Sequence, residues 1–194
     1  MWRIDLADER QHAAARVLIA ESGYERLLAV LSPWPFEALV AHLRHCSQAR
    51  WGQGRHSGLF RYYDPRLFAV CCEALLPAQA RWFHAPAIAW HWCDRDGQPR
   101  HLAGDLQPRH EVACPLPELC LTDPQIQELL TWSAAAQFHE NHALVPRDHG
   151  LSTQEALLRH LVHGLWAAQR EGTPANEQET FLHTWLAHHS VRNN

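Results

Sequence analysis

The sequence predicts an α+β protein with a small mixed α/β lobe over residues 1–103, whose strands are short and antiparallel, and a helical lobe over residues 122–194. Up to about residue 103, helical and strand-like apolar patterns alternate at short intervals. Residues 104–121 hold three prolines among polar residues, which is typical of a connecting segment. From residue 122 onward only helical patterns occur, and each begins with a capping residue.

The first lobe is predicted to alternate helices with short strands. The expected helices cover Leu6–Glu21, Phe36–Cys46, Pro65–Leu75 and Pro77–Phe83, and the expected strands cover Arg26–Leu31, Gln48–Trp51, Ser57–Tyr63, Ala87–Cys93 and Arg100–Ala103. Gly23 stops the first helix, since glycine adopts the C-terminal cap conformation readily. Gly52 and Gly54 mark a turn, so the strands on either side should pair as an antiparallel hairpin. Asp94–Gly97 marks a second hairpin turn.

The second lobe is predicted to contain three helices. Each is preceded by a residue that can cap its first amides, with a Glu or Gln three positions later to complete a capping box. The expected capping pairs are Thr122 with Gln125, Ser152 with Glu155, and Asn176 with Glu179. Leucines and aromatic residues recur at helical spacing after each pair, so every helix should bury one face.

Composition excludes several classes of function. The formal net charge is −4 and there is no basic run, so no nucleic-acid partner is expected. No apolar run reaches the length of a membrane span, and Met1–Arg10 lacks the apolar core of a signal peptide. The six cysteines form no Cys-x-x-Cys pair, so we expect a cytoplasmic protein with reduced thiols. A disulfide between Cys114 and Cys120 is the less favoured alternative.

Catalytic and metal motifs are incomplete. There is no nucleophile elbow and no phosphate-binding glycine loop. Among sixteen histidines, three pairs have the i, i+3 spacing of a helix face: His42 with His45, His139 with His142, and His160 with His163. Because no pair has a carboxylate at metal-motif spacing, we expect solvated or interface histidines, no metal site and no cofactor. The sequence therefore predicts a protein that is not an enzyme.

The stretch Gly58–Arg66 concentrates polar chemistry at one strand–helix joint. Asp64 can accept hydrogen bonds from the first free amides of a helix, and Pro65 suits the first helical position, where no donor is needed. Arg61 and Arg66 flank the joint, and either can pair with Asp64. Capping accounts for the Asp-Pro pair, but it does not account for a second arginine.

Four segments together resemble the effector adaptor, or chaperone, family of type VI secretion, first catalogued only as a domain of unknown function. They are Ser32-Pro33, His42-Leu43-Arg44, Phe60-Arg61-Tyr62-Tyr63-Asp64-Pro65-Arg66, and Gln79 with Trp82-Phe83 and Pro86. The resemblance covers about residues 24–93 well and the helical tail in outline. This sequence departs from the family where Trp82–Pro86 replaces the tighter Phe-Phe-Gly-Pro, and where the family has a further α/β segment before Ser32.

The resemblance implies an adaptor without catalytic activity, which binds a toxin effector in the cytoplasm of the donor cell and loads it onto the spike protein. The residues carried over by the motif are His42, Arg44, Arg61, Tyr62, Tyr63, Asp64, Pro65 and Arg66. They either brace the fold, with Arg44 and Arg61 supporting Asp64, or form part of the surface that meets effector or spike. Two alternatives stay open: a histidine-based metal-binding protein, and an immunity protein from the same kind of locus.

Overall fold

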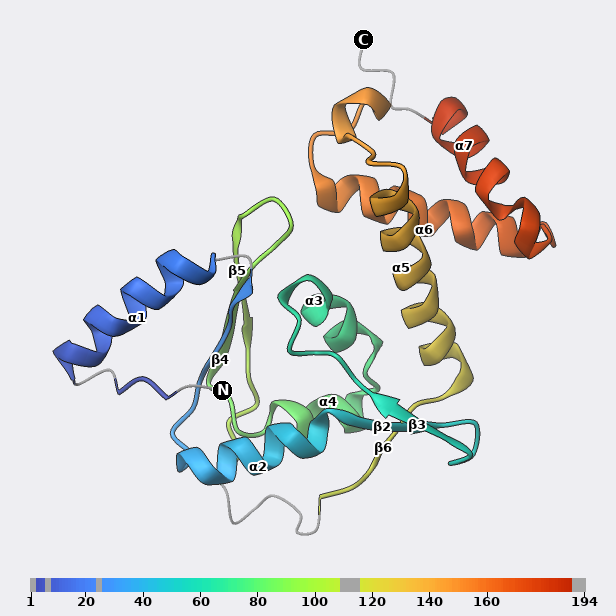
Figure 1. The fold of residues 1–194 in the computed structure, drawn as a ribbon. Helices are drawn as coiled ribbons and strands as arrows, with labels where there is room; N and C mark the ends of the chain where they lie inside the picture. The colour runs from blue at the N-terminus through green and yellow to red at the C-terminus, as the bar shows by residue number, and fades with distance from the viewer. Residues whose placement is uncertain (1–2, 6–7, 24–25, 109–115, 190–194) are drawn as a thin grey trace. The chain divides into compact units, whose positions relative to one another are not determined.

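The computed structural model of the chain describes residues 3–5, 8–23, 26–108 and 116–189 (Figure 1). Strands lie mostly in the N-terminal part and helices in the C-terminal part, which confirms the predicted α+β class. The chain forms two compact units, Met1–Gln125 and Ile126–Asn194, and each is described by itself. None of the helices in the described ranges is long and apolar enough to cross a membrane.

The first unit combines four helices with two three-stranded sheets among its described residues. The helices are α1 (Glu9–Ser22), α2 (Phe36–Cys46), α3 (Pro65–Ala74) and α4 (Pro77–His84), and the strands are β1 (Leu28–Leu31), β2 (Gln48–Trp51), β3 (His56–Leu59), β4 (Ala89–Cys93), β5 (Pro99–Ala103) and β6 (Leu119–Cys120). One sheet has the antiparallel order β1-β4-β5. The other has the order β3-β2-β6, in which β2 and β3 form the predicted hairpin and β6 runs parallel to β2.

An aromatic core holds the first unit together. Phe68 of α3, Phe83 of α4 and Trp90 of β4 are each at most 1% exposed. The ring of Trp90 lies 5.1 Å from that of Phe68 and 5.7 Å from that of Phe83, which it stacks on. Phe60 and Tyr62, between β3 and α3, add their rings to the same cluster. Aromatic pairs at these separations attract beyond their burial, so two helices and a sheet share one core.

Two glutamines join β6, α4 and the start of α5 (Asp123–Asn141). The Gln125 side chain accepts a hydrogen bond from the Thr122 amide at 2.9 Å, which confirms the predicted helix start. It donates to the carbonyl of Ala74 and to the Gln79 side chain, both at 2.7 Å. Gln79 in turn donates to the carbonyl of Cys120 at 2.7 Å. The segment predicted as a connection thus contributes a strand that is tied to the helices on either side of it.

The second unit is built from α5, α6 (Gln154–Arg170) and α7 (Gln178–His189), with 3₁₀ turns at Pro146–His149 and Ala175–Glu177. Helices α6 and α7 pack closely at Gly164, where an added methyl group would stand 2.9 Å from side-chain atoms of both Leu182 and Trp185. The buried face of α6 is rich in leucine: Leu157, Leu158, Leu161 and Leu165. The predicted helical lobe is therefore present, with each helix burying one side.

Several predicted boundaries are corrected by the structure. The strand expected over Ser57–Tyr63 ends at Leu59. The Phe60 amide makes a last bond to the carbonyl of Ser47 at 2.8 Å, and the chain then turns, with the Asp64 amide donating to the Arg61 carbonyl. Of the three aromatic residues after Leu59, Phe60 and Tyr62 are buried and Tyr63 is exposed, but none of them belongs to the strand.

The starts of two C-terminal helices are also corrected. The α6 cap is Thr153 and not Ser152, because the Thr153 hydroxyl accepts from the Ala156 amide at 3.0 Å. The last helix begins at Gln178 and not after Asn176, since a 3₁₀ turn occupies the intervening residues. The described cysteines are free thiols, whereas Cys114 of the alternative disulfide lies outside the described residues.

Candidate functional site

The strand–helix joint after β3 is organised by Asp64. Its backbone is extended and its Oδ1 atom accepts a hydrogen bond from the Arg66 amide at 3.1 Å, which caps α3. Pro65 follows at the first helical position and is buried. The local sequence explains this geometry, since aspartate is a preferred N-cap and proline lacks the amide that a cap would have to satisfy.

Both flanking arginines pair with the Asp64 carboxylate. Arg66 binds it through two nitrogens, with Nε donating to Oδ1 at 3.1 Å and Nη2 donating to Oδ2 at 2.9 Å. Arg61 donates from Nη2 to Oδ2 at 3.2 Å. The fork of Arg66 matches the carboxylate plane, which fixes the orientation of its guanidinium as well as its position. The prediction that Arg61 or Arg66 pairs with Asp64 is thus met by both residues.

The charge state of Asp64 follows from these contacts. Its partial burial acts to raise the pKa, but the hydrogen bonds from Arg66 and the positive charges of Arg66 and Arg61 outweigh burial and hold the pKa of Asp64 below its ordinary value. Asp64 is therefore ionised at neutral pH. One carboxylate then sits between two guanidinium groups, so the joint carries a net positive charge.

The exposed part of this joint is a small surface formed by Arg61, Tyr63 and Arg66, here called the corner surface. The side chains of Arg61 and Arg66 are each 56% exposed, whereas that of Asp64 is only 10% exposed. Tyr63 is 48% exposed. A largely covered anion thus holds two exposed cations next to an exposed aromatic ring, an arrangement suited to contacting another protein.

Tyr62 points the other way and belongs to the core. It is 4% exposed, and its hydroxyl donates to the carbonyl of Leu43 at 2.8 Å. Burial, with smaller contributions from neighbouring Cys46 and Tyr63, raises the pKa of Tyr62 above its ordinary value. Tyr62 therefore stays protonated and ties the joint to α2, which is a role in the fold.

His42 and Arg44, the other motif residues, lie outside the corner surface. His42 is 2% exposed, its Nε2 lies 3.4 Å from the carbonyl oxygen of Phe83, and its ring contacts those of Trp34 and Trp82 edge-on. Arg44 is exposed on α2, and the described ion pairs of Asp64 come from the two flanking arginines rather than from it. His42 therefore serves the packing of α2 on α4.

The thiol beside the joint is buried. Cys71, on α3, is 4% exposed. Burial, reinforced by the negative charge of Asp64 and only partly offset by Arg61, raises the pKa of Cys71 to about 12. At neutral pH the thiolate, which is the reactive form, is negligible.

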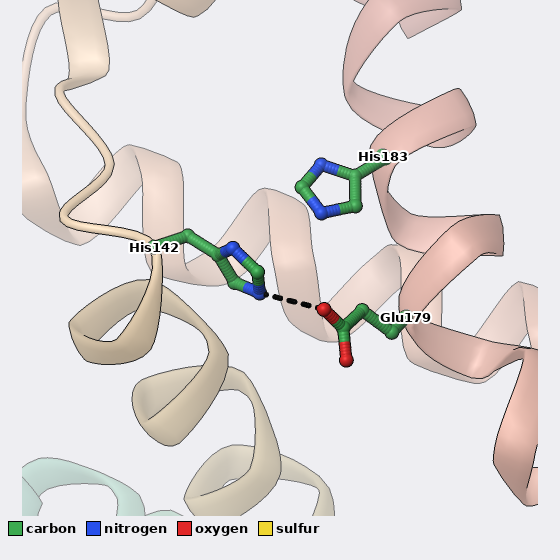
Figure 2. A group of neighbouring side chains, drawn as sticks. All are labelled: His142, Glu179 and His183. Carbon is green, nitrogen blue, oxygen red and sulfur yellow. Dashed lines mark ion pairs between the residues drawn. The ribbon is translucent and has the colours of Figure 1, made fainter.

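The structure brings together a second group of side chains that the sequence patterns did not predict. His142, just after α5, meets Glu179 and His183 of α7 (Figure 2). The sequence pattern paired His142 with His139, but His139 instead lies 2.8 Å from the side-chain oxygen of Gln154. Glu179 and His183 do have the i, i+4 spacing of one helix face, which is the signal that would have indicated half of the group.

Comparisons with known proteins locate a relationship in the N-terminal part of the chain. No curated protein matches the sequence, and no solved structure matches it. Residues 2–81 match a family model described as Domain of unknown function (DUF4123). The matched range contains α1 to α3 and the whole corner surface, so this part of the chain is similar to that family.

Proposed function

We propose that this chain is a non-enzymatic adaptor of type VI secretion, which binds a toxin effector in the cytoplasm of the donor cell and brings it to the spike protein. The observation that carries the proposal is the corner surface, in which Asp64 holds Arg61 and Arg66 in place beside the exposed Tyr63. The adaptor-like motif spans this same joint, and it lies inside the segment that matches the family of unknown function.

The arrangement suits recognition because the arginines are held before a partner arrives. An exposed arginine normally loses side-chain freedom when it binds, at about 0.5–1.5 kcal/mol for each immobilised side chain. Here the two-nitrogen contact of Arg66 with Asp64, at 3.1 and 2.9 Å, already restricts that freedom. Arginine and tyrosine are also enriched among the residues that dominate protein interfaces.

The chemistry of the surface indicates the kind of segment it would accept. Two guanidinium groups share one carboxylate, so the excess charge is positive, and guanidinium groups recognise carboxylates through paired hydrogen bonds. The partner segment should therefore present an acidic side chain near an apolar or aromatic residue that can cover Tyr63. Either the effector or the spike protein can supply such a segment.

The test is capture of the partners encoded next to this chain. The tagged chain is co-expressed with each neighbouring spike and effector candidate, and the co-purified protein is quantified. Arg61→Ala and Arg66→Ala should each reduce capture, and the double variant should reduce it more than tenfold. All three variants should keep the circular dichroism spectrum of the unsubstituted chain. Arg81→Ala is the matched control, because Arg81 is an exposed arginine on α4 outside the corner surface.

Two results would count against the proposal in different ways. If the unsubstituted chain captures neither a spike protein nor an effector, the adaptor function is wrong. If capture is strong but the double variant retains it, the function stands and the corner surface is the wrong surface. A cell-based assay separates the immunity alternative: loss of an adaptor abolishes delivery from the donor, whereas loss of an immunity protein sensitises the recipient.

A further inference from the structure

The strongest unexplained feature lies in the second unit, where His142, Glu179 and His183 point into one space (Figure 2). His142 stands in the turn that follows α5, and the other two residues lie one helical turn apart on α7. The Nε2 atom of His142 is 3.2 Å from the Oε1 atom of Glu179. One ligand atom from each of the three residues lies within 4.8 Å of the other two.

Packing positions the two imidazoles. The ring of Phe138, which is 8% exposed, lies 4.4 Å from that of His142 and 5.2 Å from that of His183. The two imidazoles face each other edge-on at 4.8 Å. An ion pair between His142 and Glu179 accounts for one contact of the group. It does not account for a second imidazole brought to the same carboxylate against an apolar wall.

The distance between two of the three residues fits the inner ligands of a small divalent ion. Imidazole nitrogens and carboxylate oxygens lie about 2.0–2.2 Å from zinc, so two ligands in a tetrahedral arrangement stand about 3.4 Å apart. The His142–Glu179 separation of 3.2 Å is close to that value. His183 is exposed, and its ligand atom lies within 4.8 Å of those of His142 and Glu179, so its ring would turn toward them when an ion binds.

We propose that His142, Glu179 and His183 form a site for a divalent transition-metal ion of the zinc class. Two imidazoles and one carboxylate are the donor set that such borderline ions accept, and water would complete the fourth position. The bound ion would fasten the turn after α5 to α7, two segments that are 37 to 41 residues apart in sequence. This site is independent of the corner surface and of the proposed adaptor function.

The test uses the full chain, purified without a histidine tag and stripped of metal with a chelator. Titration calorimetry with Zn²⁺ should show one tight equivalent, and Co²⁺ should give the visible absorption bands of a tetrahedral complex. Zn²⁺ should also raise the thermal unfolding midpoint, because an ion that binds only the folded state stabilises it. His183→Ala and Glu179→Gln should each weaken Zn²⁺ binding by more than about tenfold and remove the midpoint shift.

His163→Ala is the matched control, because His163 is exposed on α6 in the same unit and lies outside the group. It should leave the tight equivalent unchanged, which separates the site from general binding by a histidine-rich chain. The inference is overturned if no stoichiometric ion binds, or if His183→Ala and His163→Ala weaken binding equally. Since Glu179 has a side chain 67% exposed, Glu179→Gln should fold even if a His142 variant does not.

Discussion

Replacing Asp64 by alanine removes the cap of α3 and both arginine contacts at once. Loss of an N-cap costs about 0.5–2 kcal/mol. Each exposed ion pair adds about 0.2–1 kcal/mol, and the low end applies here because both guanidinium groups are more than half exposed to solvent. Asp64→Ala should therefore lower the free energy of unfolding by roughly 1–2.5 kcal/mol, and Asp64→Asn should lower it less because asparagine still caps a helix.

Urea denaturation followed by far-ultraviolet circular dichroism measures this change, and hydrogen exchange of the amides of α3 locates it. Because the pKa of folded Asp64 is depressed, the stabilisation is present above the ordinary pKa near 3.9 and is lost as the pH falls through the folded value. The gap between the unsubstituted chain and Asp64→Asn should accordingly shrink below about pH 4. An Asp64→Ala variant as stable as the parent, or a gap to Asp64→Asn that persists unchanged in acid, would refute the reasoning.

Three further predictions concern the core of the first unit. Tyr62→Phe removes the buried hydroxyl that donates to Leu43, so unfolding in urea should become easier by about 1–3 kcal/mol because a carbonyl is left without that donor. Burial, opposed by the charge of Asp105, lowers the pKa of His84 to about 4, so stability should fall as the pH drops from about 6.5 toward 4, and His84→Gln should flatten that dependence. Gly104→Ala places a methyl group into the backbone of Ala87, and thermal denaturation should show a loss of at least about 1–3 kcal/mol.

Each of these has an outcome that would contradict it. A Tyr62→Phe variant that keeps its stability would mean that the Leu43 carbonyl finds another donor. A His84→Gln variant with the same acid sensitivity as the parent would assign that sensitivity to other groups. For Gly104, the matched control is Gly97→Asn, where nothing lies within 4 Å of an added methyl group and asparagine tolerates the positive φ. Equal losses of stability for Gly104→Ala and Gly97→Asn would contradict the steric argument.

Sequence reasoning succeeded where a local signal decides the structure. The α2 and β2 boundaries were predicted at the residues observed, and Asp64 with Pro65 begins α3 as expected. These elements end at residues that act on their immediate neighbours, such as a cap or a proline. The displaced cap of α6 shows the limit of such signals, because Ser152 and Thr153 both carry a capping hydroxyl and the pattern does not choose between them.

Sequence reasoning failed where a structure depends on contact with a residue that is remote in sequence. The strand predicted over Ser57–Tyr63 was too long at its C-terminal end, since nothing in the residues themselves shows that Tyr62 turns inward to reach Leu43. The pairing of β6 with β2 joins two short segments about seventy residues apart, so no local sequence pattern predicts it. The His142 group is of the same kind, because α7 must be placed beside the end of α5 before its ligands meet.

Gln79 of α4 and Gln125 at the start of α5 make the junction of β6, α4 and α5 insensitive to pH and salt. Gln79 and Gln125 are amides, which carry no charge to lose in acid and no ion pair for salt to screen. The corner surface is the opposite, since its geometry depends on one ionised carboxylate. In acid or concentrated salt the arginines of the corner should loosen while β6 and the first turn of α5 keep their register on α4. The first unit thus combines a corner surface whose geometry depends on pH and salt with a β6–α4–α5 junction whose geometry does not.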